Sequence, residues 1–412
     1  STLKSARIII NQCSEGGIDH GNYVTKGMAE VLAAYNCALI ADMFGDAPCS
    51  QAALIDENGS PVYLTPKMDK QEEIYTQAMQ YLDDAIADLQ KEDLIDPEAQ
   101  DLLYQGDAEK WLKLAYGLKA RYTMHLLKRS ANKDADMEKV LEYVNNSFES
   151  AEEQAAFDVY DANNINPLYG FFVARAGLGA SESMRSKLAE YNDPRLSRAF
   201  ITKQGTSGKE QAPGTADNAV YAPNGTPEQG TSKYGTSLFM YSISAPTLLL
   251  SYHELKFLEA EALCRLERDA KSALKDAVVA GLLNAENSFT ISRKELGKTL
   301  INAASSITEA EAESYFDNTI EAKYTAEPLK TTMTQKYFAL WGASGEATES
   351  YNDVRRMKGL GENFIELKNP NSFPLRCPYG NSDTTTNAEV KAAYGNGQYV
   401  YSENVWWAGG SR

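Results

Sequence analysis

Five segments of this chain place apolar residues three or four positions apart, which is the spacing of one buried face of an α-helix. They cover residues 24–39, 74–89, 111–126, 248–266 and the residues that follow Thr308. A helix with a single apolar stripe is stable in water only when the stripe packs against other elements. The pattern therefore predicts an all-α fold in which helices pack mainly on helices.

Residues that favour helix starts precede several of these segments. Asp69 with Glu72, and Thr308 with Glu311, have capping-box spacing, and Asp107 is a good N-cap. The helices expected after Asp69 and after Asp107 follow each other closely, as in helix–turn–helix repeats. No 34-residue consensus repeat is visible, so the pairing predicts tetratricopeptide-like helix pairs without a strict repeat.

Long irregular stretches separate the helical segments. Residues 202–236 hold six Gly, six Thr and three Pro, a composition that forms turns rather than a core helix. Residues 158–240 and 368–412 are both expected to be rich in loops. No linker divides the chain, so we predict one domain over residues 1–412 that carries these regions as insertions.

Composition and motifs exclude several classes of function. The 40 Lys and Arg against 57 Asp and Glu give a net charge of −17, which disfavours nucleic acid. No uninterrupted apolar stretch is long enough to cross a bilayer. Five cysteines without a CxxC pair, and three histidines, predict no metal site or cofactor. No nucleophile, zinc or phosphate-loop motif is present, so we predict no enzyme activity.

Seven short motifs occur along the chain in a fixed order. In sequence order they are DMFGDAPCSQA (42–52), QEEIY with LDDAI (71–75 and 82–86), GD with KW and LKAR (106–121), NDPRL (192–196), YHELKF with EAEA (252–262), QKYFAL with RR (335–340 and 355–356), and FPLR with Asn387 (373–376). Each is weak alone. Together, and in this order, they resemble the SusD/RagB family of surface glycan-binding lipoproteins of Bacteroidetes.

The resemblance implies a fold, a function and partners. It implies a right-handed superhelical scaffold of tetratricopeptide-like helix pairs, with long loops and little β-structure. It implies non-catalytic capture of nutrient oligosaccharide and delivery to a SusC-like TonB-dependent transporter. The protein would lie on the extracellular face of the outer membrane, held by a lipid anchor. The alternatives are a peptide-binding member of the family, a helical-repeat scaffold for protein interactions, and, last, a helical glycoside hydrolase.

The chain also departs from the family pattern. Cys49 stands where the family usually has Tyr, and Met357 begins a segment that replaces the common Thr-Gly-x-Pro. Family members carry a lipidated N-terminal Cys and further residues before the GD-x-P motif. We therefore expect an upstream segment with the lipidation site to be absent from this sequence.

The ligand site is expected where loop aromatics and planar polar groups occur together, because sugar rings stack on aromatic faces and their hydroxyls bind amides and carboxylates. The loop at residues 160–172 is dense in both. Asn163, Asn164 and Tyr169 are the first candidates to contact ligand. Tyr63, Tyr221 and Tyr234, from loops that could face this one, are the second set.

Overall fold

The computed structural model describes residues 2–412 except 176–177, 205–209, 216–217, 227–232 and 370–371. The chain packs as two compact units. The first comprises Ser1–Glu153, Tyr351–Asn363 and Ser372–Arg412, and the second comprises Gln154–Ser350 and Phe364–Asn371. Both units combine segments that are distant in sequence, and the single domain stays a prediction.

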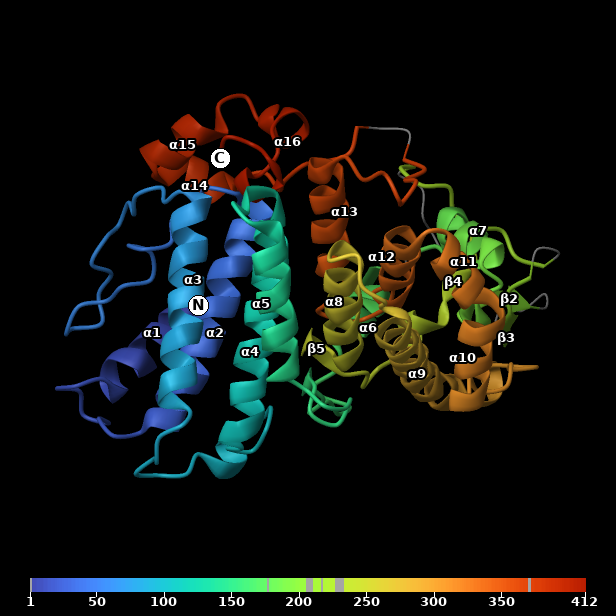
Figure 1. Cartoon of the computed structure of the whole chain (residues 1–412), viewed down its shortest axis with the longest axis horizontal. Coiled ribbons are helices and arrows are strands. Elements are labelled where there is room, and N and C mark those ends of the chain that lie inside the picture. The colour runs from blue at the N-terminus through green and yellow to red at the C-terminus, as the bar shows by residue number, and fades with distance from the viewer. Residues whose placement is uncertain (1, 176–177, 205–209, 216–217, 227–232, 370–371) are drawn as a thin grey trace. The chain divides into compact units, whose positions relative to one another are not determined.

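Helix pairs dominate the first unit. Its helices are α1 (Thr2–Cys13), α2 (Tyr23–Phe44), α3 (Gln71–Asp88), α4 (Ala108–His125), α5 (Lys133–Asn145), α14 (Asn381–Thr386), α15 (Ala388–Tyr394) and α16 (Tyr399–Ser402), with 3₁₀ turns η1 (Glu98–Gln100), η2 (Leu126–Arg129) and η7 (Trp406–Ala408). α13 (Thr348–Leu360) belongs to this unit from Tyr351 onward. From α1 to α5, each helix packs on the next, and α2 also contacts α4 (Figure 1). These contacts confirm the predicted helix pairs.

The central helix of this unit is unusually apolar. By length and composition, α2 is the one helix in the described part of the chain that could cross a membrane. Its Val31, Ala34 and Ala38 are nevertheless fully buried in the structure, and α1, α3 and α4 pack around it. The apolar composition of α2 is thus accounted for by its place in the core.

The second unit is built on three helices. α8 (Tyr252–Arg265), α9 (Lys271–Leu296) and α12 (Pro328–Ala339) pack on one another around a core that contains Phe257 and Phe289. The other helical elements are α6 (Pro167–Arg175), α7 (Glu182–Glu190), α10 (Glu309–Tyr315), α11 (Glu321–Ala326), the 3₁₀ turns η3 (Pro194–Ser197), η4 (Leu238–Tyr241) and η5 (Gly297–Thr299), and the π-helical turn η6 (Phe316–Ile320).

The strands of the second unit are short. β1 (Ala155–Phe157) pairs antiparallel with β5 (Thr247–Leu250), with Phe157 opposite Thr247. β2 (Phe200–Gln204) lies between β3 (Glu210–Pro213) and β4 (Thr236–Ser237), antiparallel to both. No strand in the described residues exceeds five residues. The predicted all-α fold with little β-structure is confirmed.

The predicted loop regions contain more regular structure than expected. Residues 158–240 include α6 and α7 as well as β2 and β3, and residues 368–412 include α14 to α16. These helices have nine residues or fewer, which is too short for apolar periodicity to stand out.

Two of the three predicted helix starts are confirmed. The Asp107 carboxylate accepts from the amides of Glu109 and Lys110, and Thr308 accepts from the amide of Glu311. The prediction at Asp69 is wrong by one residue, because Lys70 is the N-cap of α3 and its amide donates to the Glu73 carboxylate at 3.3 Å. Asp69 instead accepts from the amides of the turn at residues 49–50.

Candidate functional site

Two of the motifs hold the fold together. In the first unit, Gly45 ends α2 at φ +77°, a conformation that glycine adopts without strain. Asp46 accepts from the Gln71 amide at 2.9 Å, and Asp42 accepts from the Trp407 indole at 3.0 Å. All these residues are buried, so this motif fixes the end of α2 and is not open to a ligand.

The NDPRL motif does the same in the second unit. The Asp193 carboxylate binds the Arg195 guanidinium through two bonds, Nε to Oδ1 at 2.9 Å and Nη2 to Oδ2 at 2.6 Å. The third guanidinium nitrogen donates to the Phe338 carbonyl of α12 at 2.8 Å. Both side chains are buried, and the pair ties the turn that follows α7 to α12.

The first set of predicted ligand residues lies in one short region. Asn163 and Asn164 are exposed, and their amides donate to the Asp161 carboxylate at 2.7 Å each. Tyr169 lies on α6, and its hydroxyl donates to Glu295 at 3.2 Å. The structure therefore brings these three residues into one loop and the helix that follows it.

The second set is dispersed. Tyr221 and Tyr234 lie on neighbouring segments joined by a bond from the Gly235 amide to the Val220 carbonyl. Tyr221 packs edge-on against Phe200, and Tyr234 is buried. Tyr63 is exposed and belongs to the first unit. The role of all six residues as ligand contacts stays a prediction.

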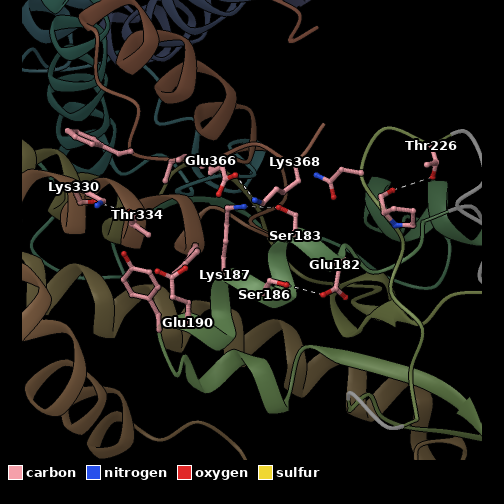
Figure 2. Close-up of a pocket in the computed structure, with 16 residues that line it drawn as sticks. Glu182, Ser183, Ser186, Lys187, Glu190, Thr226, Lys330, Thr334, Glu366 and Lys368 are labelled. Carbon is pink, nitrogen blue, oxygen red and sulfur yellow. Dashed lines mark hydrogen bonds and ion pairs between the residues drawn. The ribbon is translucent and has the colours of Figure 1, made fainter. Parts of the chain in front are cut away.

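A cavity of about 830 Å³ lies in the second unit (Figure 2). Its lining comes from α7, α12, the loop at residues 223–226 and the segment at residues 364–368. This volume is within the usual range for small-molecule sites. None of the six predicted residues lines it, so the cavity was missed by sequence reasoning.

The amphipathic character of α7 creates one wall. Ser181 caps the helix by accepting from the Met184 amide, and Met184 and Leu188 pack into the apolar cluster that contains Phe200 and Phe338. The opposite stripe, with the i, i+4, i+7 spacing of one helix face, is Ser183, Lys187 and Glu190. This polar stripe faces the cavity, as Figure 2 shows.

Most charges around the cavity have a partner. Oε1 of Glu182 lies 3.6 Å from Nη1 of Arg185. Nζ of Lys330 lies 2.8 Å from Oε2 of Glu327, and the Lys368 ammonium pairs with the Glu366 carboxylate. Lys187 differs, because its ammonium donates to the Ser183 hydroxyl at 2.7 Å and, within the described part of the chain, forms no ion pair. Burial lowers the pKa of Lys187, with the nearby Glu366 opposing the shift.

Aromatic rings contribute the apolar part of the lining. Tyr191, Phe338 and Phe364 line the cavity, and the side chain of Tyr191 is bonded to Thr334. Burial raises the pKa of the Tyr191 phenol, so this group is a neutral hydrogen-bonding partner at physiological pH. Aromatic faces beside hydroxyl, amide and charged groups are the chemistry that a saccharide needs.

Comparison with known proteins identifies the family. Residues 2–379 match the SusD-like family model, whose description is starch-binding and associating with the outer membrane. The chain therefore belongs to the SusD-like family, and the resemblance drawn from the seven motifs is confirmed. A search of curated proteins gave no match.

Solved structures agree with this assignment. A SusD/RagB family protein from Bacteroides thetaiotaomicron is 67% identical, with a TM-score of 0.94, and the match covers 100% of this chain and 86% of that one. A chitin-binding protein is 22% identical (TM-score 0.72; 98% and 85% covered), and a SusD homolog from Bacteroides fragilis is 20% identical (TM-score 0.73; 98% and 88% covered). The last two support the fold alone.

Membership places the chain among outer-membrane-associated proteins that bind nutrient glycans and are not enzymes as a family. The cavity could have been suspected from the sequence only through the polar stripe of α7. That stripe is three residues in a nine-residue helix, and it does not stand out from an ordinary solvated face.

Proposed function

We propose that this protein captures nutrient oligosaccharide at the cell surface, without catalysis, in the cavity of the second unit. Family membership is the observation that carries the proposal, since the family model describes starch-binding proteins. The cavity supports it, because it combines sufficient volume with aromatic faces and polar groups.

The charges of the cavity favour binding over hydrolysis. Glycosidases generally need two carboxyl groups that flank the scissile bond, one of them as a proton donor. Three glutamates line the cavity, and two of them, Glu182 and Glu366, are engaged by Arg185 and Lys368. Glu190 alone forms no hydrogen bond or ion pair within the described part of the chain, and a single free carboxyl group does not make a catalytic pair.

Delivery and location complete the proposal. The captured saccharide passes to a SusC-like TonB-dependent transporter, and a lipid anchor holds the protein on the extracellular face of the outer membrane. A single lipid chain binds a bilayer only marginally, so contact with the transporter would add to retention. Affinity purification from native membranes should recover the transporter together with this protein, and its reproducible absence would contradict this part.

A calorimetric panel tests the saccharide proposal. The purified protein is titrated with maltohexaose, chitohexaose, xylohexaose and uronate-containing oligosaccharides, and each mixture is assayed for new reducing ends. Binding of at least one saccharide with no new reducing ends is expected. Turnover would establish an enzyme, and binding of peptides but of no saccharide would favour the peptide-binding alternative.

Two substitutions locate the site. Thr334→Trp, on α12, fills the cavity and should abolish saccharide binding, whereas Tyr169→Ala removes the ring on α6 that sequence reasoning favoured. Loss of a stacked ring costs on the order of 1–3 kcal/mol of binding energy. If Tyr169→Ala weakens binding and Thr334→Trp folds and binds normally, the site is at α6 instead of the cavity.

A further inference from the structure

We propose that the saccharide taken into this cavity carries a carboxylate, as a uronic acid does, and that this group binds the Lys187 ammonium. The inference rests on the proposed function and deepens it by naming the class of saccharide. It follows from the arrangement of charges around the cavity.

Lys187 is a cation that forms no ion pair in the described part of the chain, although Glu366 and Glu190 lie near enough to act on its charge. It projects from the middle of α7, is half-buried, and lines the cavity close to the segment at residues 364–368 (Figure 2). A hydroxyl, that of Ser183, is its bonded partner at 2.7 Å. Removing an ammonium from water is unfavourable unless a charged or strongly polar group replaces the water. A ligand carboxylate would make that replacement.

The other two lysines of the lining do not share this property. Lys330 is bonded to Glu327, and Lys368 to Glu366. Each already has its counter-charge, so an anionic ligand would have to displace a carboxylate to reach it. Of the three lysines that line the cavity, Lys187 is therefore the one whose ammonium has no ion pair among the described residues, and it is the position at which a ligand carboxylate would add one.

Glu190 limits how much negative charge the ligand can carry. It lies on the same face of α7, three residues after Lys187, is exposed, and has no bonded partner among the described residues. A densely sulfated or fully ionised polymer would place a second anion near this carboxylate and be repelled. A saccharide with one carboxylate near Lys187 and neutral hydroxyls near Glu190 fits both groups.

The test compares matched pairs of ligands. Oligosaccharides of 4-O-methylglucuronoxylan and of hyaluronan are titrated beside their carboxyl-reduced, neutral forms, and beside maltohexaose and chitohexaose. The protein variants are Lys187→Met, which keeps the length of the side chain, and Lys275→Met, on α9 and outside the cavity lining, as the control with the same loss of charge. Circular dichroism verifies that each variant is folded.

At least one acidic oligosaccharide should bind, and more tightly than its carboxyl-reduced form by about tenfold or more, as for a hydrogen bond to a charged group. Lys187→Met should reduce the affinity for the acidic form to that of the reduced form. Lys275→Met should change neither affinity by more than about twofold.

Three results would overturn the inference. If only neutral saccharides bind, or reduced and acidic forms bind equally, the carboxylate is not recognised, while saccharide capture itself stands. If Lys187→Met and Lys275→Met weaken binding equally, the effect comes from general charge and the assignment to Lys187 fails. If no saccharide of either kind binds, the proposed function fails together with the inference.

Discussion

Replacing Arg195 by Met should destabilise the second unit more than the loss of any surface ion pair. The substitution removes both bonds to Asp193 and the bond to the Phe338 carbonyl. The Asp193 side chain is completely buried, so its carboxylate would remain without a counter-charge. Breaking a buried ion pair in this way costs about 3–5 kcal/mol.

The hydrogen bonds that Asp193 keeps in this variant decide where in this range the loss of unfolding free energy should lie. Asp193 would keep the bond from the Tyr315 hydroxyl at 3.3 Å and the bond from the Arg195 amide at 2.9 Å. Both donors stabilise the carboxylate, so we expect a loss near the lower limit, about 3 kcal/mol of unfolding free energy. The double variant Asp193→Asn with Arg195→Met removes the stranded charge and should be more stable than Arg195→Met alone.

Urea unfolding followed by circular dichroism measures these differences. Lys275→Met is the control, because it breaks the partly exposed pair with Asp317 and should leave the unfolding free energy nearly unchanged. The reasoning is refuted if Arg195→Met also costs less than about 1 kcal/mol. It is equally refuted if the loss of unfolding free energy in the double variant equals the sum of the losses in Asp193→Asn and in Arg195→Met, since the two charges would then be uncoupled.

Three further predictions concern buried groups. Burial raises the pKa of Glu30 to about 7, so the carboxylate charge of Glu30 lowers the stability of the fold as the pH rises from 4.5 through 7. Glu30→Gln should therefore raise the urea midpoint at pH 8 but not at pH 4.5. The Lys26 ammonium still has a partner in this variant, because it also pairs with Asp88. Burial lowers the pKa of His253 to about 4, so as the pH falls the imidazole is protonated in the unfolded chain before it is protonated in the folded one. Protonation therefore favours the unfolded chain, and roughly 3 kcal/mol of stability should be lost between pH 6.5 and 4. His253→Gln should reduce that loss, whereas the exposed control His20→Gln should not. Cys49→Tyr restores the usual family residue at a fully buried position and should cost about 1–3 kcal/mol by overpacking; an unchanged melting temperature would show that the site has room.

The fold was predictable because its signals are local and repeated. The stripes of α3 and α4 appear in the sequence as apolar residues at helical spacing, and Asp107 marks a helix start by its own side chain. Asp69 shows the limit of such signals. Its carboxylate is equally suited to capping a helix and to binding the turn at residues 49–50, and only the packing of that turn against it selects the second.

The cavity was not predictable for a different reason. Its lining joins α7 to α12 and to the segment at residues 364–368, both of which lie well over a hundred residues after α7 in the sequence. The aromatic density of residues 160–172 was visible, but aromatic residues in a loop do not reveal whether they line a cavity. In the structure, Tyr169 is bonded to Glu295, a residue that no sequence pattern links to it.

The most direct test of the central claim is a crystal structure of the protein soaked with the saccharide that binds most tightly in the calorimetric panel. The account predicts an intact oligosaccharide in the cavity of the second unit, with a ring against Tyr191 or Phe364 and a polar group at the Lys187 ammonium. An oligosaccharide bound only outside this cavity, or found there in cleaved form, would contradict it.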